Sequence, residues 1–186
     1  MRFEPKWKNL SIVKVDKGKW VRTAEYTIWS NMRKRVGAKR NYEDVLMSEA
    51  FADYDEWPGW ARSQKGFLSK DLGGKVFSMD KDLLSGGRGV VYCPNSVVFI
   101  PAQLNSIVTR SSKGGLRGIQ TFHNGGRKVH TVKFNFDGKT RYHGQFDSIE
   151  EACHVAEAVW RSNAMDVALR YDLDDRVYEA ISKMSY

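Results

Sequence analysis

The sequence contains no apolar run that approaches the roughly 18 residues of a membrane-spanning helix. The first ten residues, MRFEPKWKNL, also lack the apolar core of a secretory signal, so we expect a soluble protein of the cytoplasm. Cysteine is scarce: Cys93 and Cys153 match neither a disulfide framework nor a zinc-binding spacing such as C-x-x-C. Both thiols are therefore expected to be reduced and packed.

Acidic residues are the other deficit. Asp and Glu number 22 against 30 Lys and Arg, which gives a formal net charge of +8. Residues 1–40 carry roughly +9 and residues 113–145 roughly +6, whereas the last forty residues are net acidic. Two concentrated basic blocks favour a polyanionic partner, and nucleic acid is the leading candidate.

The residues that are present suffice for a folded core, because 41% are hydrophobic and 12% are aromatic. Over residues 23–36 the apolar side chains recur at helical spacing while Arg33 and Arg35 lie off that face, which predicts an amphipathic helix with a basic side. Over residues 42–60 large side chains recur every three residues. This spacing predicts a helix or tight turns that pack aromatic rings into a core.

Extended structure is predicted after Gly73-Gly74. The segments VFSMDKDLL and VVYCPNSVVFIP are rich in strand-forming residues and are separated by the glycine-rich SGGRG, so they predict a hairpin. Pro101 suits the first turn of a helix predicted over AQLNSIVTRSS. The local order is therefore strand, strand, helix, with Asp80 on the first strand and Asn105 on the helix.

A polar, glycine-bearing stretch at residues 111–115 predicts a linker. Three strand candidates follow, LRGIQTF, VHTVKFNF and TRYHGQF, and Asp137-Gly138 joins the last two as a strong hairpin dipeptide. A helix is predicted over residues 148–170, with Ser148 as its N-cap and Glu151 three residues on, a capping-box pattern. Its apolar stripe is expected to lie across the three-stranded sheet.

The triplet Asp80-Lys81-Asp82 interrupts an apolar context, and in isolation it is most simply a surface hairpin. Its surroundings point further. The stretch MDKDLLSGGRGVVYCPNSVVFIPAQLN is similar to the nuclease segment of HNH homing endonucleases of small tailed phages, in which D-K-D-[IL]-L precedes Y-S-P, V-F-x-P and a helix with I-N. The similarity extends upstream to a W-x-x-M-x-x-R pattern at Trp29, Met32 and Arg35.

The resemblance implies a ββα-metal finger that hydrolyses phosphodiester bonds. Hydrolysis needs an activated water and a divalent cation that offsets charge on the phosphate. By position in the motif, Asp80 and Asn105 are the implied oxygen ligands of Mg²⁺ or another divalent cation. Ser96 aligns with a second motif position that is usually an asparagine.

Lys81 stands where the family usually has a general-base histidine. A lysine is protonated at neutral pH and is a poor base unless its pKa falls by several units. The interpretation that follows makes Lys81 a cation that stabilises the transition state, with Asp82 or metal-bound hydroxide handling the proton.

Downstream, GLRGIQ and KTRYHGQFDSIEEA are similar to the Apetala/ethylene-response DNA-binding domain of plants, whose sheet lies in the major groove. Strand alternation in VHTVKFNF puts Thr131, Lys133 and Asn135 on the outward side. Together with the resemblance and the basic helix, this gives the expected DNA contacts: Arg33, Arg35, Arg117, Gln120, Lys133, Asn135 and Tyr142. Gln120 stands where the family prefers arginine, which implies a different target sequence.

The sequence therefore predicts an α+β protein with a basic helical region at 1–68, an HNH-like finger at 69–112 and an Apetala-type domain at 113–186. We expect an endonuclease that cuts double-stranded DNA at preferred sites in the bacterial host cytoplasm. The expectation includes no membrane and no small-molecule cofactor, and a monomer is allowed. Two alternatives stay open: a catalytically inactive DNA-binding protein of the same origin, acting in regulation or counter-defence, and an RNA-binding protein.

Overall fold

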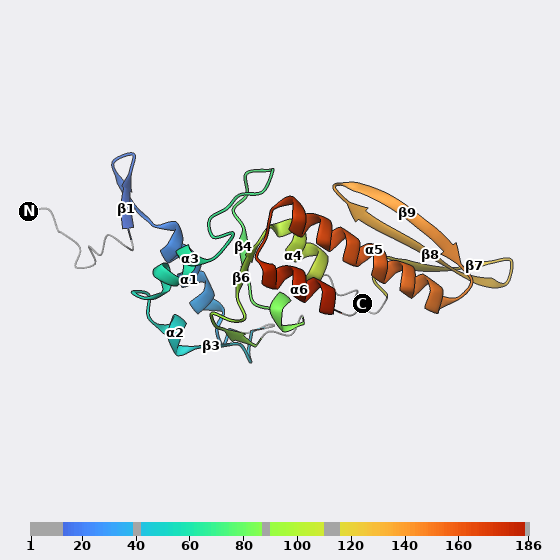
Figure 1. The fold of residues 1–186 in the computed structure, drawn as a ribbon, viewed down its shortest axis with the longest axis horizontal. Helices are drawn as coiled ribbons and strands as arrows, with labels where there is room; N and C mark the ends of the chain where they lie inside the picture. Colours follow the sequence, from blue (N-terminus) through green and yellow to red (C-terminus); the bar gives the residue numbers. More distant parts are fainter. Residues whose placement is uncertain (1–12, 39–41, 87–89, 110–115, 185–186) are drawn as a thin grey trace, which may run out of the picture. The chain divides into compact units, whose positions relative to one another are not determined.

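The computed structural model describes residues 13–38, 42–86, 90–109 and 116–184. The chain divides into two compact units, Met1–Ile100 and Pro101–Tyr186, and each is described by itself (Figure 1). Both units mix helices with small sheets, which is the α+β class predicted from the sequence. Within the described residues, no helix combines the length and apolar character needed to cross a membrane.

The first unit is made of short elements. They are β1 (Val13–Asp16), β2 (Lys19–Arg22), α1 (Ala24–Arg35), β3 (Leu46–Met47), α2 (Glu49–Ala52), α3 (Trp57–Ser63), β4 (Ser78–Asp80), the 3-10 helix η1 (Leu83–Ser85), β5 (Val91–Tyr92) and β6 (Val98–Ile100). The β1–β2 hairpin was not predicted from the sequence. Its turn residues Lys17 and Gly18 both have positive φ, at 48° and 77°. The basic helix α1 is confirmed.

The predicted hairpin is present but is rearranged. β4 pairs antiparallel with β6, with Met79 opposite Phe99. β5 does not continue into β6 as one strand, because the Ser96 hydroxyl accepts the Cys93 N–H at 3.1 Å and donates to the Val91 carbonyl at 2.6 Å. These bonds close a tight turn, and β5 pairs instead in parallel with β3.

Aromatic rings from α2, α3 and β6 form the core of this unit, as their spacing predicted. Phe51 and Trp57 are fully buried, and the ring of Trp60 lies 4.4 Å from that of Phe51, measured between centroids. Trp29 of α1 joins them by donating its indole N–H to the Phe51 carbonyl at 2.9 Å. This core holds α1 in place beside the residues that follow β4.

The second unit begins with α4 (Ala102–Thr109), followed by β7 (Ile119–Asn124), β8 (Arg127–Phe136), β9 (Lys139–Phe146), α5 (Ile149–Arg170) and α6 (Asp175–Lys183). The three strands form an antiparallel sheet in the order β7-β8-β9, and α5 packs along it (Figure 1). The core between them consists of Val132, Ala152 and Ala156, with Ile119, Phe134, Phe146 and Val155 around it. This sheet-and-helix arrangement is the one predicted.

Two local signals held in detail. Asp137 and Gly138 take positive φ values of 52° and 74° in the β8–β9 turn, as that dipeptide favours. The Ser148 hydroxyl accepts the N–H groups of Glu150 and Glu151 at the start of α5. The return bond of the predicted capping box differs, because the Ser148 hydroxyl itself donates to the Glu150 carboxylate.

Helix α4 belongs to the second unit by its contacts. The Trp160 indole of α5 donates to the Ile107 carbonyl at 2.9 Å, and the Gln103 amide donates to the Asp137 carboxylate at 2.7 Å. The units therefore divide after Ile100, so α4 belongs to the second unit and not to the finger predicted over residues 69–112.

A bulge interrupts the pairing of β8 with β9. Thr131 lies opposite Gln145 and Lys133 lies opposite Tyr142, so β9 carries one extra residue between them. Gly144 makes this possible, because its φ is +126° and an added Cβ would lie 2.7 Å from the Phe146 ring. Thr131, expected to face outward, is 5% exposed.

Candidate functional site

Asp80, the first residue of the D-K-D triplet, is buried where β4 ends. Asp80 is 5% exposed, and its Oδ1 accepts the N–H groups of Asp82 at 3.0 Å and of Leu83 at 2.8 Å. These bonds turn the chain from β4 into η1. Burial raises the pKa of the Asp80 carboxyl, and the negative charge of Asp82 acts in the same direction. The two N–H bonds and the charge of Lys81 act in the opposite direction, but burial outweighs them.

Lys81 is a buried cation. Its side chain is 7% exposed, and its Nζ donates to the Asp82 carboxylate at 2.6 Å. The Asp82 side chain is 33% exposed. The Nζ also lies 5.7 Å from the ring centroid of Tyr42 and 5.8 Å from that of Tyr92, within the range of cation–π attraction. One carboxylate and two aromatic rings thus replace the water around this ammonium group.

Arg35 joins the same residues from α1. Its guanidinium forms a hydrogen bond with the Tyr92 hydroxyl and lies 5.9 Å from the centroid of the Tyr42 ring. Burial raises the pKa of the Tyr92 phenol, so this hydroxyl stays protonated at neutral pH. We call the following residues the charged cluster: Arg35, Tyr42, Asp80, Lys81, Asp82 and Tyr92.

The sequence identified Arg35 and the triplet but assigned them to separate sites. The two tyrosines were missed, because Tyr92 reaches Lys81 through the parallel pairing of β5 with β3, which no local pattern indicates. The available sequence signal was Tyr92-Cys93-Pro94, which stands at the Y-S-P motif of the resemblance. The Ser96 hydroxyl donates to the Val91 carbonyl in the turn before β6. Arg33 is exposed on α1, and its guanidinium lies 4.9 Å from the Trp29 ring centroid.

The chemistry of the cluster fits a hard divalent cation. Asp80 and Asp82 supply carboxylate oxygens, the donors that Mg²⁺ prefers, and a bound cation would offset the burial that raises the pKa of Asp80. Asn105 lies on α4 in the other unit, so its pairing with Asp80 stays a prediction. Among the residues that the structure describes, no three His, Cys, Asp or Glu side chains gather as a ready-made metal site.

The second unit presents a different surface. Because Val132 and Phe134 face α5, the alternate residues of β8 face the other way, and the register adds their neighbours on β7 and β9. We call this the outer face. It comprises Gln120, Phe122, Asn124, Arg127, Val129, Thr131, Lys133, Asn135, Thr140 and Tyr142. Four predicted DNA contacts, Gln120, Lys133, Asn135 and Tyr142, therefore share one face.

The outer face suits a polyanion. The strands β7, β8 and β9 contain no Asp or Glu, and two basic residues, Arg127 and Lys133, lie on the outer face. Arg127 also pairs with Asp147, which follows β9. Two aromatic side chains are exposed there, Tyr142 at 61% and Phe122 at 47%. Phe122 was not anticipated, although the alternation of residues 119–124 places it beside Gln120.

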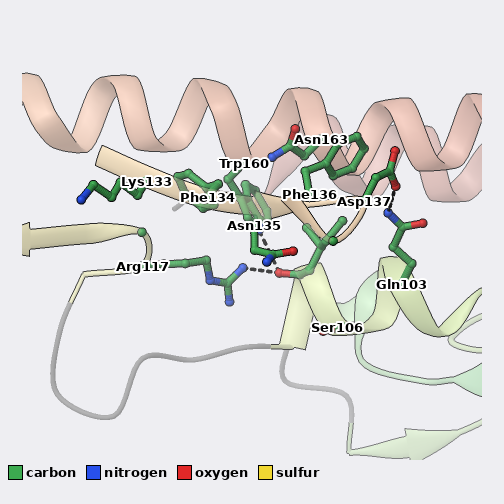
Figure 2. Close-up of a pocket in the computed structure, with 13 residues that line it drawn as sticks. Gln103, Ser106, Arg117, Lys133, Phe134, Asn135, Phe136, Asp137, Trp160 and Asn163 are labelled. Atoms are coloured by element: carbon green, nitrogen blue, oxygen red, sulfur yellow. Dashed lines mark hydrogen bonds between the residues drawn. The ribbon is translucent and has the colours of Figure 1, made fainter. Parts of the chain in front are cut away.

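Arg117 behaves differently from its predicted neighbours. It precedes β7, and its guanidinium donates to the Ile107 carbonyl of α4 and lies 5.4 Å from the Trp160 ring centroid. Figure 2 shows it in an open pocket lined by residues of α4, β8 and α5, with the end of the Lys133 side chain directed away from it. The volume of this pocket is about 480 Å³. Arg117 thus lies near Lys133 and Asn135, which line the same pocket, but its guanidinium is engaged by α4 and α5.

The chain matches no family model, no curated protein and no solved structure. The functional argument therefore rests on the geometry of the charged cluster and the outer face.

Proposed function

We propose that the chain is a metal-dependent endonuclease whose charged cluster hydrolyses phosphodiester bonds and whose outer face binds double-stranded DNA. The observation that carries this proposal is the burial of Lys81, whose ammonium group pairs with Asp82 next to the buried carboxylate of Asp80. Taking these charges out of water costs folding free energy that pairing seldom recovers in full. Perturbed ionisable groups gathered at one place are characteristic of functional sites.

Each residue of the triplet has a proposed role that its environment supports. Asp80 would hold Mg²⁺, which would supply positive charge to the scissile phosphate. Lys81 stabilises the charge that develops on the phosphate oxygens, and Asp82 orients its ammonium group. Asp82 is also the more exposed carboxylate of the triplet, so it is placed to take the proton of the attacking water.

DNA binding is proposed for the outer face because it is basic, free of acidic residues along its strands and rich in amide and aromatic side chains. A sheet of this kind can enter the major groove, where the four base pairs present different hydrogen-bonding patterns. Lys133 would contact phosphate, while amide side chains would contact base edges.

A second function is favoured by one specific observation. Every charged group of the triplet already has an internal partner: Asp80 accepts two backbone N–H groups, and Lys81 pairs with Asp82. These bonds would let the triplet serve as a structural turn. On that basis the chain would be a DNA-binding protein that does not cut.

The two functions differ in a cleavage assay with separate binding measurements. The wild-type chain should cut plasmid and phage genomic DNA with Mg²⁺ and leave both intact with EDTA. Asp80→Asn keeps an oxygen acceptor for the two N–H groups, so it should fold and bind DNA while losing cleavage by about 10²-fold or more. Binding without cleavage in the wild-type chain, across Mg²⁺ and Mn²⁺, would establish the second function.

A further inference from the structure

The outer side of β7 carries an ordered chemical pattern. Gln120, Phe122 and Asn124 follow each other at every second residue and are all exposed, so amide, aromatic ring and amide point from one face. Side chains on one face of a strand recur about every 6.8 Å. Base pairs in B-DNA are stacked about 3.4 Å apart, so these three side chains span a few base pairs of a groove.

The chemistry of this row is selective. An Asn or Gln amide forms two hydrogen bonds with the N6 and N7 edge of adenine, and an apolar side chain contacts the methyl group of thymine. Guanine is typically read by Arg or Lys, and this row of β7 contains neither. The row therefore lacks the usual guanine reader and holds the readers of both bases in an A·T pair.

Phe122 is the residue that makes the pattern specific. It is 47% exposed, and its partner across the sheet, Val129, is buried at 6% exposure. An exposed aromatic ring among amides contributes little to phosphate attraction, whereas it offers an apolar surface at the height of the base edges. Lys133 lies on the neighbouring strand β8, two residues beyond Thr131, the partner of Gln120, and supplies positive charge that attracts DNA to this face.

We propose that β7 reads A·T base pairs in the major groove, with Phe122 against the thymine methyl group and with Gln120 and Asn124 on adenine. This inference rests on the proposed binding of double-stranded DNA by the outer face. It adds the class of target sequence and names Phe122 as a residue that determines specificity.

The test uses the full-length chain in EDTA, which prevents cleavage. Sites are first selected from a random pool of duplexes, and the enriched sites should contain A·T pairs at fixed positions. Each thymine of the best site is then replaced by deoxyuridine, which removes the methyl group alone. At one position this should weaken binding about fourfold, the effect of one buried methyl-sized group. The same exchange should have no effect on the Phe122→Ala chain.

Two controls separate the possible results. His123→Ala changes the neighbouring residue, whose side chain alternation directs to the opposite face, and should retain the deoxyuridine effect. Lys133→Ala should weaken binding to every duplex, and this variant should also retain the deoxyuridine effect. Replacing adenine with 7-deazaadenine removes the N7 acceptor and should weaken binding to the wild-type chain but not to Gln120→Ala or Asn124→Ala at the matching position.

The outcomes are distinct. Selection of G·C sites, or a deoxyuridine effect that persists in Phe122→Ala, would overturn the inference while leaving DNA binding by the outer face intact. Failure to bind any duplex would overturn the proposed function itself. A thymine-methyl effect that disappears only with Phe122→Ala would establish the inference.

Discussion

The two units of this chain handle charge in opposite ways. In the first unit, Asp80 and Lys81 are both 5% exposed and are surrounded by tyrosines, other charges and backbone N–H groups. In the second unit, the charges of the sheet stand in solvent on strands without acidic residues. A buried charge interacts strongly with its neighbours, but its burial costs desolvation free energy. An exposed charge interacts weakly because water and salt screen it, and it costs little desolvation free energy. The first arrangement suits chemistry on a bond, and the second suits attraction of a large polyanion.

The difference should be largest in catalysis. Lys81→Met replaces the buried ammonium with an apolar side chain of similar length, so it should reduce DNA cleavage by about 10²-fold or more. Affinity for DNA should change less than about twofold, because the outer face is untouched. Single-turnover cleavage and fluorescence-anisotropy binding measure the two effects. Equal losses of cleavage and of DNA affinity would mean that the cluster binds DNA instead of acting on the phosphate. Lys34→Ala is the control, because it removes an exposed positive charge outside the cluster.

Folding stability should distinguish the two carboxylates of the triplet. Asp82→Asn leaves the buried Lys81 ammonium without its carboxylate and should lower the free energy of unfolding by roughly 1–3 kcal/mol. Asp80→Asn removes a charge that burial disfavours and keeps the acceptor oxygen, so it should raise the thermal midpoint by roughly 2–5 °C. Thermal and urea unfolding at neutral pH test this. A fall in stability with Asp80→Asn would show that the ionised carboxylate is structural.

Salt dependence should separate the two faces of the sheet. Lys133 lies on the outer face, whereas Lys139 pairs with Phe136 and is directed by alternation to the α5 side. Lys133→Ala should lower the slope of log affinity against log salt by about one unit, and the matched variant Lys139→Ala should leave it unchanged. Titrations from about 50 to 200 mM salt measure the slope. Equal changes in both variants would indicate a diffuse field instead of a defined face.

The smallest effect is expected in acid, where carboxylates of the two units should respond with opposite signs. Hydrogen bonds from Arg170 and Gln103 lower the pKa of Asp137 to about 2. A lowered pKa means that Asp137 contributes stability above its usual value near 3.8 and loses it as the pH falls toward about 2. The pair is largely exposed, so Arg170→Ala should cost only about 0.2–1 kcal/mol at neutral pH.

Asp80 has a raised pKa, so its sign is reversed. The folded state holds this proton more tightly than the unfolded state, and stability falls as the pH rises from 3.8 through the raised value. Unfolding free energies of wild type, Asp80→Asn and Asp137→Asn between about pH 3 and 7 measure both contributions. Asp80→Asn should remove the decline at higher pH, and Asp137→Asn should remove part of the decline in acid. Parallel curves for all three proteins would contradict both assignments.

Local sequence signals predicted the second unit well because its contacts are local. The Asp137-Gly138 turn, the Ser148 cap and the alternation of β8 each depend on residues within a few positions. The hydrogen bond from Arg117 to Ile107 could not be predicted by the same reasoning, because these residues are ten positions apart and no periodicity reports that bond. Helix α6 was missed, although Asp174 caps its N-terminus and acidic residues before an apolar period were a usable signal.

The first unit was harder because its site is assembled over long distances in the sequence. The D-K-D triplet was recognised as unusual, but its burial depends on Tyr42 and Tyr92, which lie on opposite sides of it in the chain. The apolar run before Pro101 has the composition of one strand, but a turn closed by the Ser96 side chain and by backbone bonds to the Cys93 carbonyl divides it. Composition identified the charges, whereas their partners required the tertiary structure.

The parallel pairing of β3 with β5 has a consequence for how the chain folds. It joins Leu46 to Val91, so the charged cluster is complete only after a long loop has closed. The β8–β9 ribbon closes instead through a two-residue turn between Phe136 and Lys139. Loop-closure entropy must be offset before distant contacts form, so structures of high contact order fold slowly. We expect the three-stranded sheet to appear early in refolding and the cluster around Lys81 to form last.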